Sequence, residues 1–217
     1  MPPLDDLRSL TERFDVFATL AERNGAPPTW RRTATFATLV RFVLEQQVSL
    51  ASAAAAYARL ESRIGAPLPE PFLELTDEEL LSVGFSRQKT RYTREIAVRM
   101  LDGSLDLERV TATGDEGRRE LLSVTGIGPW TVACYELFVV GRPDVWPTGD
   151  RALYVSMAKN LALGHVPVKA EGDGIAAQWS PYRSTAAKML WHDYLGGSSY
   201  TVDARAGFGD NSGMVSS

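Results

Sequence analysis

The chain has 217 residues and a formal net charge of -4, with 23 lysine and arginine residues against 27 aspartate and glutamate residues. This length is enough for one ordinary domain or two small lobes with a real core. The acidic balance argues against a polycationic protein that holds nucleic acid by bulk charge. A single cysteine, Cys134, excludes an intramolecular disulfide, a multi-cysteine zinc site and a four-cysteine iron–sulfur cluster within this chain.

The start of the chain and its hydropathy predict an intracellular protein. The first residues, MPPLDDL, are acidic and lack the basic stretch and apolar segment of a signal peptide. No stretch reaches the ~18–20 apolar residues that span a bilayer. We therefore expect a soluble, monomeric protein of a reducing compartment, which is the cytoplasm and nucleoid if the source is bacterial.

The first half of the chain has the pattern of successive helices. Apolar side chains recur at i, i+3 and i+4 spacing over residues 36–44, which predicts an amphipathic helix. The alanine-rich stretch 50–60 has high helix propensity. A capping box at Thr76–Glu79 predicts a short helix that ends at Gly84, and Ser86 is a candidate N-cap for a longer helix to about residue 101.

The second half continues the helical pattern, and we expect helices over 115–123, 129–140, 151–161, 175–178 and 181–195. No run alternates apolar and polar residues between turn signals, as a strand would. The fold class is therefore expected to be all-α. Residues 197–217 are rich in glycine and serine without periodicity, which predicts a flexible tail.

The most informative segment is residues 121–140, where two helices are joined by Val124-Thr125-Gly126-Ile127-Gly128. The two glycines permit positive φ and close backbone approach, and Ile127 between them can anchor the turn in the core. Pro129 suits the first turn of the second helix. The amides of this hairpin could hold a phosphate without reading base sequence. The alternative is a tight helix–helix turn and nothing more.

Three further segments accompany the hairpin. The loop Val145–Asp150 is rich in glycine and proline, and Asp150 lies 22 positions after Gly128. The segment Leu39–Ser52 precedes the hairpin in the sequence, and the segment Trp179–Trp191 follows the loop. In this order the segments resemble the helix-hairpin-helix (HhH-GPD) DNA glycosylase superfamily, and within it the 3-methyladenine DNA glycosylase II branch. The chain is similar to the compact form, because it is too short for the extra α/β domain of larger bacterial members.

The resemblance implies a two-lobed helical bundle. One lobe would span residues 38–142 and carry the hairpin at 121–140, and the other would combine 1–37 with 143–196. The cleft between the lobes would hold Asp150 and the hairpin.

The resemblance also implies an activity: hydrolysis of the N-glycosidic bond of alkylated bases in double-stranded DNA, of the 3-methyladenine and 7-methylguanine type. The base must first be flipped out of the duplex. Asp150 would stabilise the positive charge that develops on the sugar. Its alternative role is the N-cap of the helix that follows. Asp144 is a weaker candidate in the same loop.

Aromatic walls suit a cationic methylated base, because stacking and cation–π attraction favour it over a neutral one. The resemblance places Trp130, Trp191 and Gln46 at this pocket, although a tryptophan in the core is the ordinary alternative. Trp130 stands where strand-cleaving relatives carry a catalytic lysine, so no Schiff-base lyase chemistry is expected. Cys134 stands where some members have a pocket tyrosine.

The DNA contacts implied by the resemblance fall into three groups. Gln47 would plug the gap left by the flipped base, and Ser49 would touch the minor groove. The alternative is that Gln46 and Gln47 only cap the end of their helix. The hairpin would bind phosphate through Thr125, Gly126, Ile127, Gly128 and Thr131. Further backbone contacts are expected from Arg87, Lys89 and Arg91, unless these residues form only a solvated helix face.

No cofactor is expected for catalysis. The main-chain carbonyls of Leu122, Val124 and Ile127 match the monovalent-cation site of the family, so a structural Na⁺ or K⁺ at the hairpin is expected. Two other functions stay open. One is a non-catalytic helix-hairpin-helix module that binds damaged DNA, and the other is a glycosylase for deaminated or mismatched bases.

Overall fold

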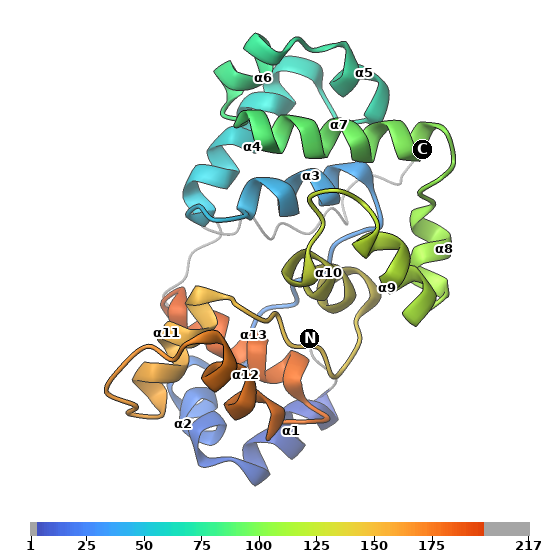
Figure 1. Cartoon of the computed structure of the whole chain (residues 1–217). Helices are drawn as coiled ribbons and strands as arrows, with labels where there is room; N and C mark the ends of the chain where they lie inside the picture. Colours follow the sequence, from blue (N-terminus) through green and yellow to red (C-terminus); the bar gives the residue numbers. More distant parts are fainter. Residues whose placement is uncertain (1–3, 198–217) are drawn as a thin grey trace, which may run out of the picture. The chain divides into compact units, whose positions relative to one another are not determined.

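The computed structural model describes residues 4–197, and this part of the chain is helical without any strand (Figure 1). The expected all-α class is confirmed for these residues. None of their helices has the length and apolar character needed to cross a membrane. Apart from Gly197, the expected tail lies outside the described residues.

The described residues divide into two units. One unit contains the segment up to Arg31 and the segment from Ala133 onward, and the other is Arg32–Val132. The sequence predicts the boundaries at residues 38 and 143, whereas the contacts place them at 32 and 133. Two side-chain contacts lie within the units so divided: Arg32 pairs with Glu45 at 2.7 Å, and Phe138 stacks on Trp191.

The Arg32–Val132 unit contains α3 to α9 and the start of α10. Their bounds are α3 Phe36–Glu45, α4 Leu50–Ile64, α5 Pro69–Glu74, α6 Asp77–Val83, α7 Arg87–Leu101, α8 Leu107–Ala112, α9 Asp115–Leu122 and α10 Pro129–Tyr135. Helix α7 packs on both α3 and α5. The buried ring of Phe72 meets Phe36 edge-on and Phe85 at a tilt. The capping box at Thr76 and the Ser86 cap form as predicted.

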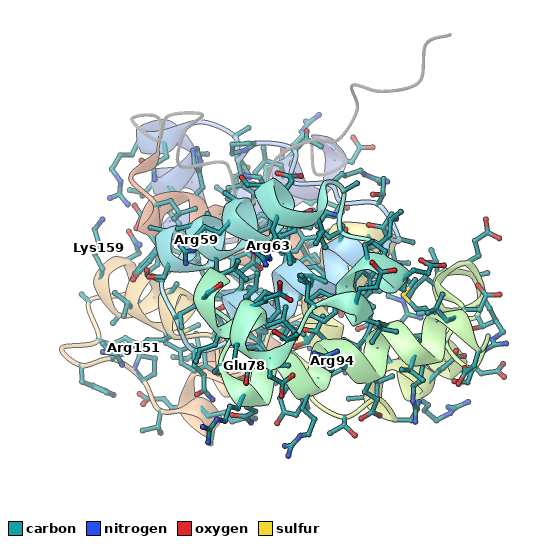
Figure 2. The ribbon with its side chains drawn as sticks, turned by 90° about the horizontal axis from the view of Figure 1, so that it is seen from above. Arg59, Arg63, Glu78, Arg94, Arg151 and Lys159 are labelled. Atoms are coloured by element: carbon teal, nitrogen blue, oxygen red, sulfur yellow. The ribbon has the colours of Figure 1, made fainter. Side chains whose placement is uncertain are left out.

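Several arginine side chains of this unit bind carbonyl or carboxylate groups at helix ends. Figure 2 labels Arg59 and Arg63 on α4 and Arg94 on α7. Arg59 donates to the Val83 carbonyl at 3.1 Å, and Arg63 pairs with Glu79. Arg94 donates to the Leu75 carbonyl at 2.6 Å, where α5 has just ended. Arg59 and Arg94 therefore satisfy carbonyls that the helices leave without partners at their C-termini, whereas Arg63 joins α4 to the first turn of α6 through a carboxylate.

The other unit contains α1, α2, the end of α10 and four later elements. Their bounds are α1 Leu4–Arg13, α2 Asp15–Asn24, the π-helical turn Glu136–Val140 that continues α10, α11 Arg151–Asn160, α12 Lys169–Ala177 and α13 Arg183–Tyr194. Helix α13 is the centre of this unit and packs on α1, α2 and α11. Packing on these three helices hides most side chains of α13 from solvent.

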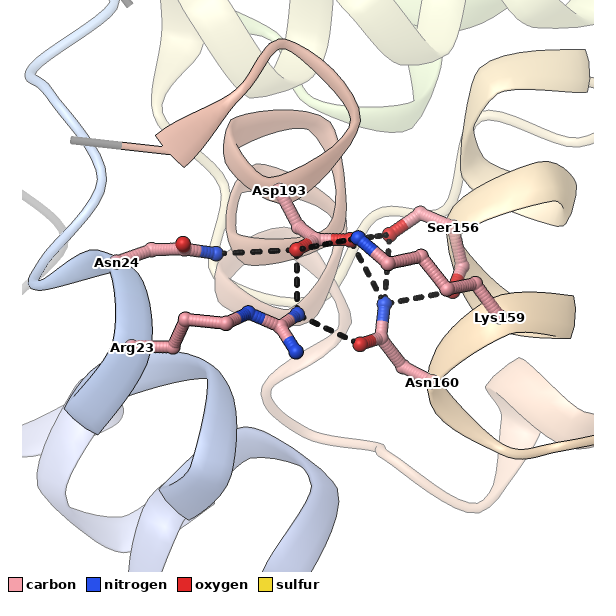
Figure 3. A network of polar contacts seen from close by, with 6 residues as sticks. All are labelled: Arg23, Asn24, Ser156, Lys159, Asn160 and Asp193. Carbon is pink, nitrogen blue, oxygen red and sulfur yellow. Dashed lines mark hydrogen bonds and ion pairs between the residues drawn. The ribbon is translucent and has the colours of Figure 1, made fainter. Parts of the chain in front are cut away.

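A buried carboxylate ties three helices of this unit together (Figure 3). Asp193 of α13 is 6% exposed and accepts hydrogen bonds from Arg23 and Asn24 of α2 and from Ser156, Lys159 and Asn160 of α11. Burial alone would raise the pKa of Asp193. The hydrogen bonds from Asn160, Asn24 and Arg23 outweigh it and lower the pKa to about 2. The network fixes the last turn of α13 against both neighbours.

Candidate active site

Asp150 lies at the junction between the glycine- and proline-rich loop and α11. It is the N-cap of α11, and its Oδ1 accepts the Leu153 amide at 2.9 Å. The same oxygen accepts the indole Nε1–H of Trp191 from α13 at 3.2 Å. The role of Asp150 as an N-cap is thus compatible with a role as the catalytic carboxylate, because the capping geometry holds the carboxylate against an aromatic side chain.

Two tryptophans were expected to line the base pocket. Trp191 is 7% exposed, and its ring stacks on Phe138 with centroids 5.4 Å apart and an interplanar angle of 26°. Trp130 belongs to the other unit, in the first turn of α10. Of the five tryptophans it is the only one that is not buried, so core packing accounts less well for it than for the other four.

Asp144, the weaker catalytic candidate, is engaged as an anchor. The Arg183 guanidinium donates to it in a bidentate fashion, with Nε–Oδ1 at 2.7 Å and Nη2–Oδ2 at 2.8 Å, and Ser180 donates to Oδ2 at 2.9 Å. These hydrogen bonds, that of Arg183 above all, lower the pKa of Asp144. The pair attaches the start of the loop to the start of α13, which places the loop that leads to Asp150.

The loop has a second anchor, Asp173 of α12, that sequence reasoning missed. Its carboxylate accepts hydrogen bonds from Trp146 and Thr148 in the loop and from Tyr154 of α11. The local sequence gives no signal for this role. Lys169 and Asp173 lie four residues apart, a spacing that is typical of an exposed helical ion pair. The helix expected over 175–178 moreover begins at Lys169, so Asp173 was outside it.

The hairpin turn forms where it was expected. The Ile127 amide donates to the Val124 carbonyl at 3.0 Å, and Ile127 is 4% exposed, so it anchors the turn in the core. The two glycines differ. Gly126 has φ +89°, and a Cβ there would lie 2.1 Å from Cγ of Tyr92, whereas Gly128 has no positive φ and a Cβ there would meet no atom within 4 Å. Only Gly126 is thus required to be glycine by the fold.

Gln46 connects the end of α3 to this hairpin. Its Nε2 donates to the Gly126 carbonyl at 2.9 Å and to Thr131 Oγ1 at 3.0 Å, and its backbone is the C-cap of α3. Thr131 is only 2% exposed and its Oγ1 already accepts from Gln46, which does not support the phosphate contact expected for it. Thr125 is exposed, and its amide donates to Glu95 Oε1 at 3.2 Å. The Gln46 side chain therefore braces the hairpin from within the same unit.

The turn between α3 and α4 presents the expected wedge residues to solvent. Gln47 is exposed and has φ +58°, a left-handed conformation that is rare for residues with a side chain. Its neighbour Val48 is 47% exposed, an apolar side chain that sequence reasoning did not single out. Ser49 is exposed as well, and its Oγ caps α4 by accepting the Ser52 amide at 3.2 Å. Such strain at an exposed turn is typical of functional positions.

The three basic residues at the start of α7 are not equivalent. Lys89 donates from Nζ to the Leu44 carbonyl at 2.6 Å, and burial lowers its pKa. Its ammonium therefore caps the end of α3, which does not support the phosphate contact expected for it. Arg87 and Arg91 are exposed and stay candidates for that contact.

The carbonyls expected to hold a monovalent cation flank the hairpin turn. The Val124 carbonyl oxygen already accepts the Ile127 amide, which leaves this oxygen one further lone pair. Val124 and Ile127 are buried, whereas Leu122 is 40% exposed. Carbonyl oxygens are hard ligands of the kind that alkali cations take, so this donor set fits Na⁺ or K⁺. No group of three or more His, Cys, Asp or Glu side chains within residues 4–197 is placed to hold a metal ion.

The chain is similar to several known proteins. It is 29% identical over 162 residues to the Bacillus subtilis protein YfjP, a match that covers 70% of this chain and 56% of that protein. It is 28% identical over 158 residues to DNA-3-methyladenine glycosylase 1 of Schizosaccharomyces pombe, covering 70% of this chain and 69% of that protein. For four of the curated relatives that it matches, the chain spans 32–60% of their length.

The fold matches a solved structure over most of its length. The 3-methyladenine DNA glycosylase Mag1 of Schizosaccharomyces pombe, solved in complex with abasic DNA, superposes with a TM-score of 0.79 at 24% identity, covering 87% of this chain and 95% of that chain. The family model described as HhH-GPD superfamily base excision DNA repair protein matches residues 40–165, which include the hairpin, the loop and Asp150. The chain therefore belongs to the HhH-GPD superfamily of base excision DNA repair proteins.

Proposed function

We propose that this protein is a monofunctional DNA glycosylase that flips out and excises alkylated bases, of the 3-methyladenine and 7-methylguanine type, from double-stranded DNA. The observation that carries the proposal is the contact between Asp150 and Trp191. It holds a carboxylate at a helix N-cap against an aromatic side chain, as a site that acts on a sugar and its stacked base requires. Relatives named as DNA-3-methyladenine glycosylases support the substrate class.

The reaction would need little beyond this carboxylate. As the C1′–N bond breaks, its electron pair goes to the base, and positive charge develops on the sugar. The Asp150 carboxylate would stabilise this charge and orient a water molecule. The water oxygen then bonds to C1′, and one of its two protons passes to the solvent. A cationic alkylated purine leaves as a neutral base, so no general acid is required. The product would be an abasic site in an uncut strand.

The base would be recognised by aromatic surfaces. Trp191 is the proposed stacking surface in its unit, and the partly exposed Trp130 is proposed as a stacking surface in the other unit, since flat electron-rich rings attract a cationic base more than a neutral one. Trp130 stands where a lyase would need a lysine, which supports base excision without strand cleavage.

DNA would be held mainly through the backbone of the hairpin. The open space around Gly128 supports a close approach of phosphate to the amides there, because nothing inside the protein requires a glycine at this position. Gln47, exposed on a strained turn, is the proposed plug for the gap left by the flipped base. A Na⁺ or K⁺ held by the carbonyls of Leu122, Val124 and Ile127 would add positive charge at the phosphate.

The test is release of free bases from randomly methylated duplex DNA, with EDTA present and the products separated by chromatography. Asp150→Asn is the matched variant, because asparagine is as good an N-cap as aspartate but carries no charge. We expect the wild type to release methylpurines and the variant to release at least about 100-fold less, as is typical for loss of one electrostatic group in an active site. Equal release by both proteins would remove Asp150 from the mechanism.

Two further outcomes would favour the other functions. Tight binding of damaged duplexes without release of any base would indicate a non-catalytic damage-binding module. Release of uracil or hypoxanthine in place of methylpurines would indicate a glycosylase for deaminated bases. Trapping with borohydride tests the absence of a lyase step, since a covalent adduct with an abasic duplex would contradict the monofunctional proposal.

A further inference from the structure

The loop that leads to Asp150 is held by one carboxylate from a different helix. Asp173 of α12 accepts the Trp146 indole Nε1–H on Oδ1 at 3.0 Å and the Thr148 hydroxyl on Oδ2 at 2.5 Å. Because the two loop side chains bind different oxygens of one rigid carboxylate, their spacing is fixed by the carboxylate itself. This spacing in turn sets the course of the chain just before Asp150.

A second contact extends the hold to the residue adjacent to Asp150. The Tyr154 hydroxyl of α11 donates to Asp173 Oδ1 at 2.7 Å and accepts the Gly149 amide at 2.8 Å. Burial, and then the hydrogen bond to Asp173, raises the pKa of Tyr154, so the hydroxyl stays protonated and able to donate. Trp146, Thr148 and Gly149 are thus all tied, directly or through one hydroxyl, to Asp173.

The partners of Asp173 are themselves fixed by packing. Trp146 is 9% exposed and meets Trp179 edge-on at 5.6 Å, and Tyr154 is 5% exposed. A Cβ on Gly172, the residue before Asp173, would lie 2.6 Å from Cε1 of Tyr154, so the tyrosine ring lies directly against the backbone of α12. Helices α11 and α12 therefore hold this hydroxyl and this carboxylate in one arrangement.

The carboxylate stays ionised in this setting. Burial raises the pKa of Asp173. Hydrogen bonds from Lys169, Thr148 and Tyr154 lower the pKa by more than burial raises it, so the net shift is downward. The Lys169 side chain, which is largely exposed, pairs with Oδ2 at 2.8 Å. An ionised acceptor makes stronger hydrogen bonds than a neutral one, which suits a group that has to hold a loop.

We propose that Asp173 is a positioning residue for base release, one that fixes the loop carrying Asp150 so that the carboxylate meets the sugar in the productive geometry. The proposal rests on the glycosylase function proposed above. Misplacing a catalytic group by about 1 Å can cost about 100-fold in rate even when the group itself is intact. Asp173 would act through this geometry alone, without touching substrate.

The variants remove the hold at three points. Asp173→Asn removes the charge, Thr148→Val removes one loop donor, and Tyr154→Phe removes the hydroxyl between Gly149 and Asp173. Ser156→Ala is the matched control for Tyr154→Phe. Both delete one buried hydroxyl from α11, but that of Ser156 donates to Asp193 and accepts from Asn160, whereas that of Tyr154 binds Gly149 and Asp173.

The measurement is the single-turnover rate of base release with enzyme in saturating excess over methylated duplex, because this rate does not depend on the folded fraction of the enzyme. We expect it to fall about 10- to 100-fold in Asp173→Asn and about 3- to 30-fold in Thr148→Val and Tyr154→Phe. The Kd for an uncleavable duplex should change by less than about threefold. Ser156→Ala should lower Tm as Tyr154→Phe does and keep the wild-type rate.

The results separate the two proposals. If the wild type releases no base from any methylated duplex, the proposed function fails, and the role of Asp173 fails with it. If the wild type is active and the three variants keep its rate, only the role of Asp173 is overturned. A rate loss in Ser156→Ala equal to that in Tyr154→Phe would likewise overturn it, because general loosening of α11 would then be sufficient.

Discussion

Of the two hairpin glycines, Gly126 is required by the fold and Gly128 is proposed to let DNA phosphate approach. Alanine substitution at each position should distinguish the two roles. At Gly126 an added Cβ would lie 2.1 Å from Cγ and 2.3 Å from Cδ2 of Tyr92, and φ is +89°. The unfavourable φ costs about 1–2 kcal/mol and the overpacking about 1–3 kcal/mol. We therefore expect Gly126→Ala to lower the free energy of unfolding by about 3 kcal/mol, which corresponds to a fall in Tm of roughly 6–12 °C for a chain of this size.

Gly128→Ala should behave in the opposite way. No atom lies within 4 Å of the added Cβ and φ is not positive, so the free energy of unfolding should stay the same or rise by up to about 1 kcal/mol through the less flexible unfolded chain. The new methyl group would, however, occupy the space proposed for a phosphate. We expect the Kd for a duplex with an abasic-site analogue to rise at least about tenfold, or about 1.4 kcal/mol.

Urea unfolding followed by circular dichroism gives the first quantity, and fluorescence anisotropy of the labelled duplex gives the second. If Gly128→Ala destabilised the protein as much as Gly126→Ala, the distinction between the two positions would be refuted. If Gly128→Ala were stable and bound DNA like the wild type, the hairpin would not be the phosphate contact.

Three other substitutions give further predictions. Gln47→Gly should raise the free energy of unfolding by up to about 1 kcal/mol, because it relieves the strain of φ +58°, and it should slow single-turnover base release. Gln47→Ala keeps the strained φ, so it should slow base release without raising the free energy of unfolding. The pKa of Asp193 is lowered to about 2, so the stability that it contributes is present above about pH 4 and is lost as pH falls towards 2. Urea unfolding over this range should show wild type losing about 2 kcal/mol more than Asp193→Asn. Burial, and then the charge of Arg31, lowers the pKa of Lys188 to about 8, so the unfolded chain binds more protons between pH 8 and 10.5 and stability should rise with pH there. The rise should exceed that of Lys188→Met by about 3 kcal/mol, and equal pH dependence in the two proteins would contradict the burial of this ammonium.

Local signals predicted the helices that depend on local chemistry. The cap at Ser86, the capping box at Thr76 and the glycine stop at Gly84 are short-range features, and the structure confirms each of them. The hairpin was likewise predictable from short-range features, because Gly126 supplies the positive φ of the turn and the apolar Ile127 beside it is buried. Motif order then located Asp150 and Trp191, which the structure brings into contact.

What could not be predicted depends on contacts between distant segments. Helix α12 begins at Lys169, six residues before the expected start at 175, because Gly172 and Gly174 weaken the local helix signal. Gly172 is nonetheless suited to its place, since the ring of Tyr154 lies against it. Lys89 appeared in the sequence as one of several basic side chains on an exposed face, and only the fold brings the Leu44 carbonyl to it.

The internal use of arginine has a consequence for how the protein would search DNA. The guanidinium groups of Arg59, Arg94 and Arg183 are occupied within the fold, and the chain has a net charge of -4. Each phosphate neutralised by a cationic side chain contributes about -0.9 to the slope of log affinity against log salt. Binding mainly through neutral amides, with Arg87 and Arg91 as the candidate cationic contacts, would release few counterions, so affinity would change little with ionic strength. Such a protein would gain little from long electrostatic sliding and would sample a genome by brief, repeated encounters.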